Sequence, residues 1–164
     1  MSSKAVEQRV LSLAQAGRRL EGGVSAMRGL TTESQSHRES EEQRDPRTSA
    51  IIGAAIEVHR YLGPGLLESA YEECLCHELH LLGLAFERQV DLPVAYKGLK
   101  LDCGYRIDLI VQNQVVLELK AIERILPMHE AQLLTYLKLS GKRVGLLINF
   151  NEPLLTRGII RRVL

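Results

Sequence analysis

Two short apolar segments, residues 106–111 and 115–120, are separated by only three polar residues, Gln-Asn-Gln. Segments rich in valine, isoleucine and leucine favour β-strands, and so short a connection makes the two strands antiparallel neighbours. The second segment reads V-V-L-E-L-K and carries Glu118 and Lys120 inside an otherwise hydrophobic run. Burying an ion costs several kcal/mol unless the ion is paired or bound. The hairpin therefore either lies at an exposed edge or turns these charges toward something that needs them.

The length of the connection decides whether the charged faces of the two strands coincide. Side chains alternate across a strand, so a slip of one residue moves every side chain to the opposite face. A two-residue loop would put Asp108 on the wrong face, whereas a loop of residues 112–114 pairs Val111 with Val115 and places Asp108 opposite Glu118. Such a loop needs a left-handed residue, which asparagine tolerates. We therefore predict the three-residue loop, with both carboxylates on one face of the sheet.

This predicted face has the chemistry of a metal site. Two close carboxylates repel each other unless a cation joins them. Mg²⁺ suits the position because it takes oxygen ligands, keeps several waters and often bridges to phosphate. Lys120 beside Asp108 and Glu118 can hold an attacking water or stabilise developing negative charge, as metal-assisted phosphodiester hydrolysis requires. Glu-x-Lys is also common on solvated strand faces, so a purely structural hairpin stays open at this point.

Length and composition place limits on the class of protein. The chain has 164 residues and a formal net charge of +1, which suits one domain and does not indicate a strongly basic nucleic-acid-binding protein. No apolar run reaches the 18 residues of a membrane span, and no signal-peptide pattern is present. Three cysteines, Cys74, Cys76 and Cys103, are too few for a disulfide framework,. We expect a cytoplasmic protein without a membrane segment.

The first 48 residues differ from the rest of the chain. Residues 31–47 are rich in Ser, Glu and Arg and contain no hydrophobic residue, so they cannot bury enough surface to offset the entropy of ordering. Apolar residues at helical spacing between positions 6 and 17 allow a short helix. We predict that residues 1–48 form a disordered extension and that residues 49–164 form the folded domain.

Within the domain, the pattern predicts helices, then strands, then a helix and a strand. Ser49 is a plausible N-cap for a helix that stops at Gly63, and a second helix ends at Gly83,. An outer or bent strand over residues 85–96 precedes strands over 101–111 and 114–122. The final predicted elements are a helix over 127–140, a strand over 143–150 and a short strand over 157–164. This order predicts a layered mixed α/β fold.

Several motifs together resemble a known family. Residues 49–164 are similar to the GxxExxY proteins, a branch of the PD-(D/E)XK nuclease-like superfamily. Gly65 to Tyr71 match the name-giving motif, and the Gln-x-x-x-Tyr element is like that of exonuclease domains in bacterial recombination complexes. The motif residues follow the family's order along the chain: Gly65, Glu68, Tyr71, Asp108, Glu118, Lys120, Gln132 and Tyr136.

The resemblance implies a fold and a set of roles. The fold is α/β, with an αβββαβ core in which helices flank a central mixed sheet. Asp108, Glu118 and the backbone carbonyl of Leu119 would bind Mg²⁺ or Mn²⁺, and Lys120 would position the nucleophilic water. The other residues that the resemblance brings to the site are Glu68, Gln132 and Tyr136.

Two functions are carried forward from the sequence. The first is a Mg²⁺-dependent nuclease acting on nucleic acid, with DNA favoured. The alternative is a catalytically silent module of the same fold that binds nucleic acid or a protein partner, with a homo-oligomer also open. Near-neutral charge and the absence of an evident basic-aromatic patch count against strong single-strand binding.

Some residues have simpler readings that also remain open. Tyr71 and Tyr136 fit a hydrophobic core as well as a site, and His59 and His129 fit structural or surface roles. Cys74 and Cys76 resemble zinc ligands together with His77 and His80. Helix positions two apart diverge by roughly half a turn, however, so one metal could not collect both cysteines.

Overall fold

The computed structural model describes residues 45–101 and 104–164 of the chain. The predicted extension therefore lies outside the described residues up to position 44. In chain order the elements are α3 (Pro46–Leu62), α4 (Glu68–Leu81), β1 (Phe86–Asp91), β2 (Val94–Tyr96), β3 (Leu99–Leu101), β4 (Arg106–Val111), β5 (Val115–Lys120), α5 (Pro127–Ser140), β6 (Val144–Asn149), the short 3-10 helix η1 (Leu155–Arg157) and β7 (Ile159–Val163). None of the helices in these ranges combines the length and hydropathy needed to cross a bilayer.

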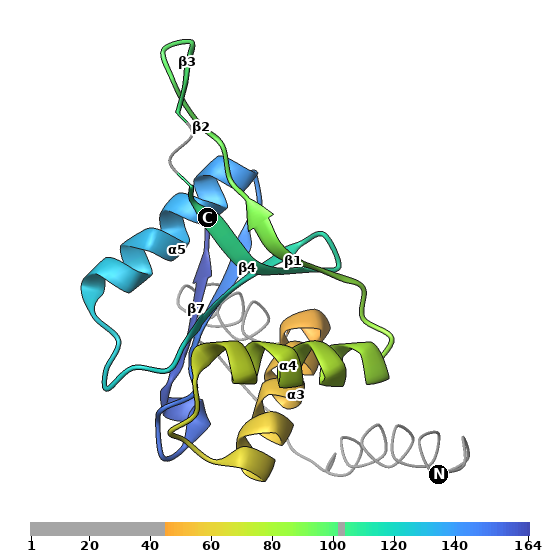
Figure 1. Ribbon diagram of the computed structural model, residues 1–164. Coiled ribbons are helices and arrows are strands. Elements are labelled where there is room, and N and C mark those ends of the chain that lie inside the picture. The colour runs from red at the N-terminus through yellow and green to blue at the C-terminus, as the bar shows by residue number, and fades with distance from the viewer. Residues whose placement is uncertain (1–44, 102–103) are drawn as a thin grey trace, which may run out of the picture. The chain divides into compact units, whose positions relative to one another are not determined.

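The central sheet has five strands in the order β1-β4-β5-β6-β7, as Figure 1 shows. β5 and β6 are parallel, and every other neighbouring pair in this sheet is antiparallel. A parallel pair needs a crossover connection, which α5 supplies between these two strands,. The predicted mixed α/β fold is confirmed.

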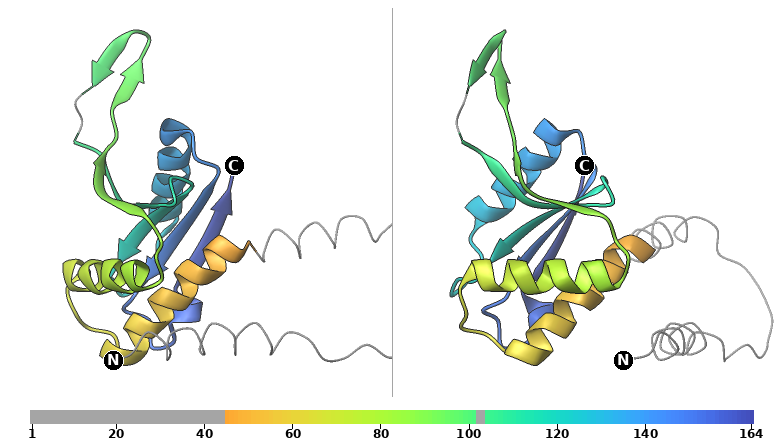
Figure 2. Two further views of the ribbon diagram at one scale, coloured as in Figure 1. Left: turned by 90° about the vertical axis from the view of Figure 1, so that its right-hand side faces the viewer. Right: turned by 45° about the vertical axis from the view of Figure 1, so that its right-hand side comes forward.

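Helices cover both faces of this sheet, and each face has its own hydrophobic core (Figure 2). On one face α3 and α4 pack against alternate residues of the strands, including Leu109, Leu117 and Leu146. On the other face α5 packs against the intervening residues, including Val116 and Leu147. The charged residues of β4 and β5 share their position in the alternation with this second set, so they belong to the α5 side of the sheet.

The β4–β5 connection has the predicted length. Val111 pairs with Val115 and Leu109 with Leu117, and the intervening residues 112–114 form the turn. Asn113 has a φ of 54°, the left-handed conformation expected of it, and Gln112 has a φ of 52°, which was not anticipated. The Asn113 side chain also accepts a hydrogen bond from Lys142 Nζ at 2.6 Å. The three-residue loop is confirmed.

The first described helix begins earlier than predicted. Asp45, rather than Ser49, is its N-cap, because the Asp45 side chain accepts a hydrogen bond from the backbone N–H of Arg47. Pro46 occupies the first turn, where its missing N–H costs nothing,. The Asp-Pro pair is a stronger start signal than the serine, and Ser49 donates its own N–H to the Asp45 carbonyl within the first turn.

A second, two-stranded sheet was missed from the sequence. The segment predicted as one strand over 85–96 is divided around Pro93 into β1 and β2, since proline cannot donate to a sheet ladder. β2 pairs with β3, of which only Leu101 lay within the predicted strand over 101–111. Lys97 and Gly98 form the connecting turn, and both have positive φ angles, as two-residue hairpin turns require,. This β2–β3 hairpin projects away from the central sheet (Figures 1 and 2).

Candidate active site

Asp108 and Glu118 lie where the pairing of β4 and β5 ends. The last pair of the ladder is Leu109 with Leu117, and continuing the register places Asp108 opposite Glu118. At this position a side chain replaces the ladder, because Asp108 Oδ2 accepts a hydrogen bond from the backbone N–H of Leu119 at 2.8 Å. The bond fixes the Asp108 carboxylate against β5, on the same side as Glu118.

Lys120 connects the second carboxylate to the backbone. Its Nζ donates to Glu118 Oε1 at 2.7 Å and to the carbonyl oxygen of Leu119 at 2.9 Å. The side chain of Glu118 is only 3% exposed and that of Lys120 is 15% exposed. Glu118 and Lys120, the two charges within the hydrophobic strand, are therefore largely removed from solvent and paired with each other.

The pairing leaves the site with uncompensated negative character. Glu118 Oε2 is buried and has no hydrogen-bond partner among the described residues. Burial, followed by the neighbouring Asp108 carboxylate, raises the pKa of Glu118 to about 7, although Lys120 opposes the shift. Burial also raises the pKa of Asp108, against the hydrogen bond from Leu119. The two acids resist being charged together unless additional positive charge is present.

Lys120 is held in its charged form. Burial by itself would lower the pKa of Lys120, but the hydrogen bond to Glu118 and the surrounding carboxylates outweigh it and leave the pKa raised. The ammonium group is therefore a fixed cation at neutral pH, with its donors directed at the carboxylate and the Leu119 carbonyl.

Glu68 comes to the same region from the other layer, at the first residue of α4. Burial raises the pKa of its carboxyl, while the Lys120 charge lowers it and the Asp108 charge raises it. The charges of Lys120 and Asp108 therefore both act on Glu68, although Glu68 belongs to α4 and the other two residues belong to β4 and β5. Its negative charge is also favourable at the start of a helix.

The remaining residues of the Gly-x-x-Glu-x-x-Tyr motif position the loop before α4. Tyr71 is fully buried and stacks on Phe150, with ring centroids 4.5 Å apart. Its hydroxyl donates to the carbonyl of Gly63 at 2.6 Å and accepts from the backbone N–H of Leu66 at 3.1 Å. Gly65 has a φ of 100°, which a residue with a side chain rarely adopts,. Tyr71 is thus a core residue that holds the chain leading to Glu68.

Gln132 and Tyr136 lie on one face of α5, as their spacing predicted. Gln132 Nε2 donates to the Tyr136 hydroxyl at 2.6 Å, and Tyr136 is 3% exposed within the α5-side core. Burial raises the pKa of Tyr136, with smaller contributions from Glu118 and Asp108. Tyr105, which precedes β4 and is half exposed, meets the Tyr136 ring edge-on at 6.4 Å.

Sequence reasoning missed a second acidic group next to the site. Glu72 is buried and follows Glu68 by one turn of α4; it accepts hydrogen bonds from Arg88 Nε at 3.0 Å and Gln89 Nε2 at 2.7 Å. Gln89 has a φ of 48° and lies between the β1 residues that pair with Leu109 and Ile107, so it faces Asp108 in the register. The four-residue spacing of the two glutamates was the available signal.

Asn149 was also missed, although it lies directly beside the lysine. It pairs with Lys120 across β5 and β6 and is completely buried. Its side chain accepts from the backbone N–H of Ile122 at 3.0 Å and donates to the Ile122 carbonyl at 2.8 Å. The Lys120 carbonyl in turn accepts from the N–H of Phe150 at 2.7 Å. These bonds fix the backbone immediately after the lysine.

The histidines that were considered near the site have structural partners. His59 Nε2 forms a 2.7 Å hydrogen bond with the Glu152 carbonyl, and His129 Nδ1 accepts from the backbone N–H of Leu126 at the start of α5. Across residues 45–101 and 104–164, no group of three or more His, Cys, Asp or Glu side chains is arranged to hold a metal ion.

The donor set at the strand ends still fits a hard divalent cation bound with water. Mg²⁺ is usually held by one or two carboxylates and keeps several waters. Asp108 and Glu118 supply two carboxylates, and the unpartnered Oε2 atom of Glu118 is a buried acceptor without a donor. The Leu119 carbonyl, the third predicted ligand, accepts a hydrogen bond from Lys120 Nζ at 2.9 Å and keeps a second lone pair. Asp108 and Glu118 are therefore the residues that would hold the ion.

A five-stranded mixed sheet between helical layers, with Asp on one strand and Glu-x-Lys on the next, defines a nuclease-like α/β domain. A family model described as the PD-(D/E)XK nuclease superfamily matches residues 45–163. The chain therefore belongs to the PD-(D/E)XK nuclease superfamily. No curated protein and no solved structure matched the chain.

Proposed function

We propose that this protein is a Mg²⁺-dependent nuclease that hydrolyses phosphodiester bonds in nucleic acid, with DNA as the favoured substrate. The single observation that carries the proposal is the joined set at the ends of β4 and β5. Asp108 and Glu118 share one face, and Lys120 lies in contact with Glu118. Burying charged side chains lowers the stability of a fold, and a site for metal-dependent hydrolysis requires these charges.

The residues of this chain divide the chemical work. Asp108 and Glu118 would hold the divalent cation, which when bound would supply a Lewis acid to polarise a phosphoryl oxygen. Lys120 orients the attacking water through its ammonium donors and stabilises the negative charge that develops on the phosphoryl group. Glu68 lies at the side of this group, where burial raises the pKa of its carboxyl, and it is placed to accept a proton from the attacking water. Gln132 and Tyr136 line the α5 side.

The β2–β3 hairpin supports a nucleic-acid substrate. It joins β1 to β4, the strand that carries Asp108. Residues 94–101 contain two lysines and no acid, and Tyr96 is 60% exposed with Lys97 Nζ 5.4 Å from its ring centre. An exposed aromatic ring beside cations is the surface on which single-stranded bases stack and phosphates bind. This basic-aromatic patch was not evident in the sequence.

Removing both lysines of the hairpin, Lys97→Ala with Lys100→Ala, is expected to weaken binding of a single-stranded oligonucleotide about tenfold. Each lysine neutralises about one phosphate, so the slope of log K against log salt should become shallower by about 1.4. Fluorescence anisotropy over a salt series in EDTA measures both quantities. The matched control removes two exposed cations elsewhere, Lys138→Ala with Arg157→Ala, and equal losses in the two doubles would contradict a role for the hairpin.

The proposed function is tested by metal dependence. Purified protein is incubated with single-stranded DNA, duplex DNA and RNA in Mg²⁺, Mn²⁺ or EDTA, and cleavage is expected only with a metal. Mn²⁺ at a hundredfold excess over its dissociation constant should stabilise the fold by about 2.7 kcal/mol. Glu118→Gln should lose most of this increase, while the metal-free variant stays folded because a neutral amide replaces a buried carboxylate.

Absence of cleavage on every substrate, together with metal-independent nucleic-acid binding, would instead support the silent binding module. We also propose that the chain belongs to the GxxExxY branch of the superfamily, since Gly65, Glu68 and Tyr71 have the motif spacing. Tyr71 also binds the backbone on both sides of Gly65, at Gly63 and Leu66. Cys74 and Cys76 are free thiols, as suits a protein of the reducing cytoplasm, which is where we propose that it acts.

A further inference from the structure

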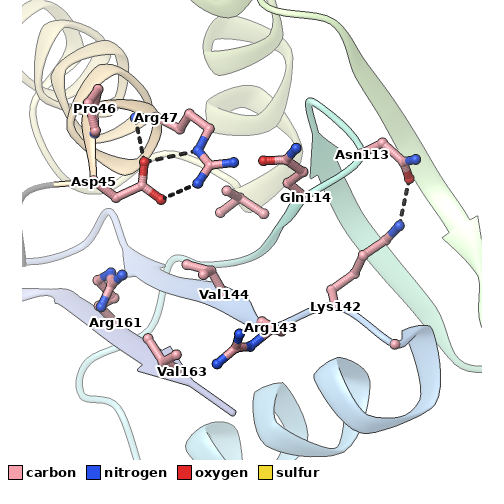
Figure 3. Close-up of a pocket in the computed structure, with 12 residues that line it drawn as sticks. Asp45, Pro46, Arg47, Asn113, Gln114, Lys142, Arg143, Val144, Arg161 and Val163 are labelled. Atoms are coloured by element: carbon pink, nitrogen blue, oxygen red, sulfur yellow. Dashed lines mark hydrogen bonds and ion pairs between the residues drawn. The ribbon is translucent and has the colours of Figure 1, made fainter. Parts of the chain in front are cut away.

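A cavity of about 700 Å³ opens at the end of the sheet where β5 and β6 begin. It lies between the start of α3, the β4–β5 loop, the start of β6 and β7 (Figure 3). Four cationic side chains line it: Arg47, Lys142, Arg143 and Arg161. Asp45 is the only acidic side chain in the lining.

This concentration of positive charge is not a property of the domain as a whole. Residues 45–164 contain 14 Lys and Arg and 14 Asp and Glu, so the domain is formally neutral. Four of those cations and one of those carboxylates meet in this cavity. A local excess of three positive charges in a concave surface attracts and concentrates anions.

The cations are held in different ways, which shows which of them are available. Arg47 is engaged by Asp45, with Nε 3.0 Å from the carboxylate, and this pair also caps α3. Lys142 binds the amide oxygen of Asn113, and Arg143 Nε donates to the Leu164 carbonyl at 3.3 Å. The Asn113 amide is a neutral acceptor, so the charge of Lys142 stays uncompensated.

Arg161 adds a donor without an acceptor. Its Nε is buried and makes no hydrogen bond within the described part of the chain. Buried polar atoms are almost always hydrogen-bonded, so one that is not marks a position where a ligand or ion can bind. Figure 3 shows the Arg161 guanidinium between Asp45 and Val163, on the side of the cavity opposite Lys142.

We propose that this cavity binds a phosphate group, carried by a free nucleotide or by a nucleic-acid strand. The volume is that of small-ligand sites, and arginine donors match the oxygens of phosphate in a bidentate manner. The site is distinct from the acidic one, because Val115 borders the cavity and Lys120 lies at the opposite end of the same strand, about 17 Å away,. It does not depend on the proposed nuclease activity.

The test measures binding in EDTA, so that the acidic site contributes nothing through metal. Inorganic pyrophosphate is titrated by calorimetry, and 5′-phosphorylated and 5′-hydroxyl oligonucleotides of one sequence are titrated by anisotropy. Lys142→Gln with Arg143→Gln is expected to weaken pyrophosphate binding at least tenfold. Lys138→Gln with Arg157→Gln, which removes the same charge from exposed positions outside the cavity, should change it less than twofold. Arg143→Gln alone, at an exposed side chain, serves as a variant that leaves the Lys142–Asn113 contact intact.

The source of the phosphate is read from the oligonucleotides. If the protein prefers the 5′-phosphorylated strand and the Lys142/Arg143 double variant loses that preference, the cavity binds the phosphate at a strand end. If the double variant binds both strands more weakly by the same factor, the cavity binds a backbone phosphate. Pyrophosphate binding alone assigns a free nucleotide or related anion. Failure of all three probes to bind at millimolar concentration, or equal weakening by the two double variants, overturns the proposal.

Discussion

Replacing Lys120 with glutamine is expected to lower the rate of metal-dependent cleavage by about 10² to 10³-fold, the usual loss when one charge-stabilising donor is removed. Glutamine keeps a neutral donor near Glu118 Oε1, so the change removes the charge with little change in packing. The fixed ammonium, 2.7 Å from that carboxylate, is the one cation of the chain in contact with the proposed metal ligands among the described residues. Single-turnover cleavage at saturating Mg²⁺ measures the effect on the chemical step.

Two measurements separate this loss from unfolding. Urea denaturation should show a cooperative transition for Lys120→Gln, and Mn²⁺ should still raise its stability because Asp108 and Glu118 are unchanged. Lys138→Gln, at an exposed position on α5, should cleave like the parent protein. A Lys120→Gln protein that cleaves at the parent rate would show that the lysine is only a structural partner of Glu118.

Replacing Tyr71 with alanine is expected to reduce the free energy of unfolding by about 3–5 kcal/mol, as for other buried aromatic residues. The ring is fully buried and stacked on Phe150. Tyr71→Phe keeps the stack but leaves the Gly63 carbonyl and the Leu66 N–H without their partner, which should cost about 1–3 kcal/mol,. Urea denaturation followed by circular dichroism measures both.

Tyr61 provides the matched control, since its side chain is 88% exposed. Tyr61→Ala should change stability by no more than about 0.5 kcal/mol. If Tyr71→Phe proves as mild as this control, the hydroxyl does not hold the loop before Glu68, and the motif tyrosine contributes by packing alone.

The parts of the structure that could be predicted are those fixed by local sequence. The register of β4 and β5 followed from alternation and the length of one loop, and both are visible within a dozen residues,. The bounds of α5 followed from Pro127 and Gly141, which start and stop helices for reasons of backbone geometry,. The faces of Gln132 and Tyr136 followed from their spacing.

The parts that could not be predicted depend on contacts between distant segments. Asn149 binds Ile122, 27 positions away in sequence, and nothing in the run I-N-F indicates that partner. Glu72 and Gln89 meet across α4 and β1, and the cations of the cavity come from α3, the α5–β6 connection and β7. The hydrogen bond from the Lys120 ammonium to the Leu119 carbonyl was not predicted either, because it depends on a flexible four-carbon side chain folding back on its own strand.

The turn at residues 112–114 has a consequence for how this domain tolerates insertions and deletions. Surface loops ordinarily accept such changes at small energetic cost, yet here one residue more or fewer would shift the pairing of β4 and β5 by one position. Asp108 would then rotate into the hydrophobic layer beneath α3 and α4, and an apolar neighbour would face Glu118. The length of the turn at one end of the hairpin thus determines whether the two acids at the other end lie on the same face of the sheet.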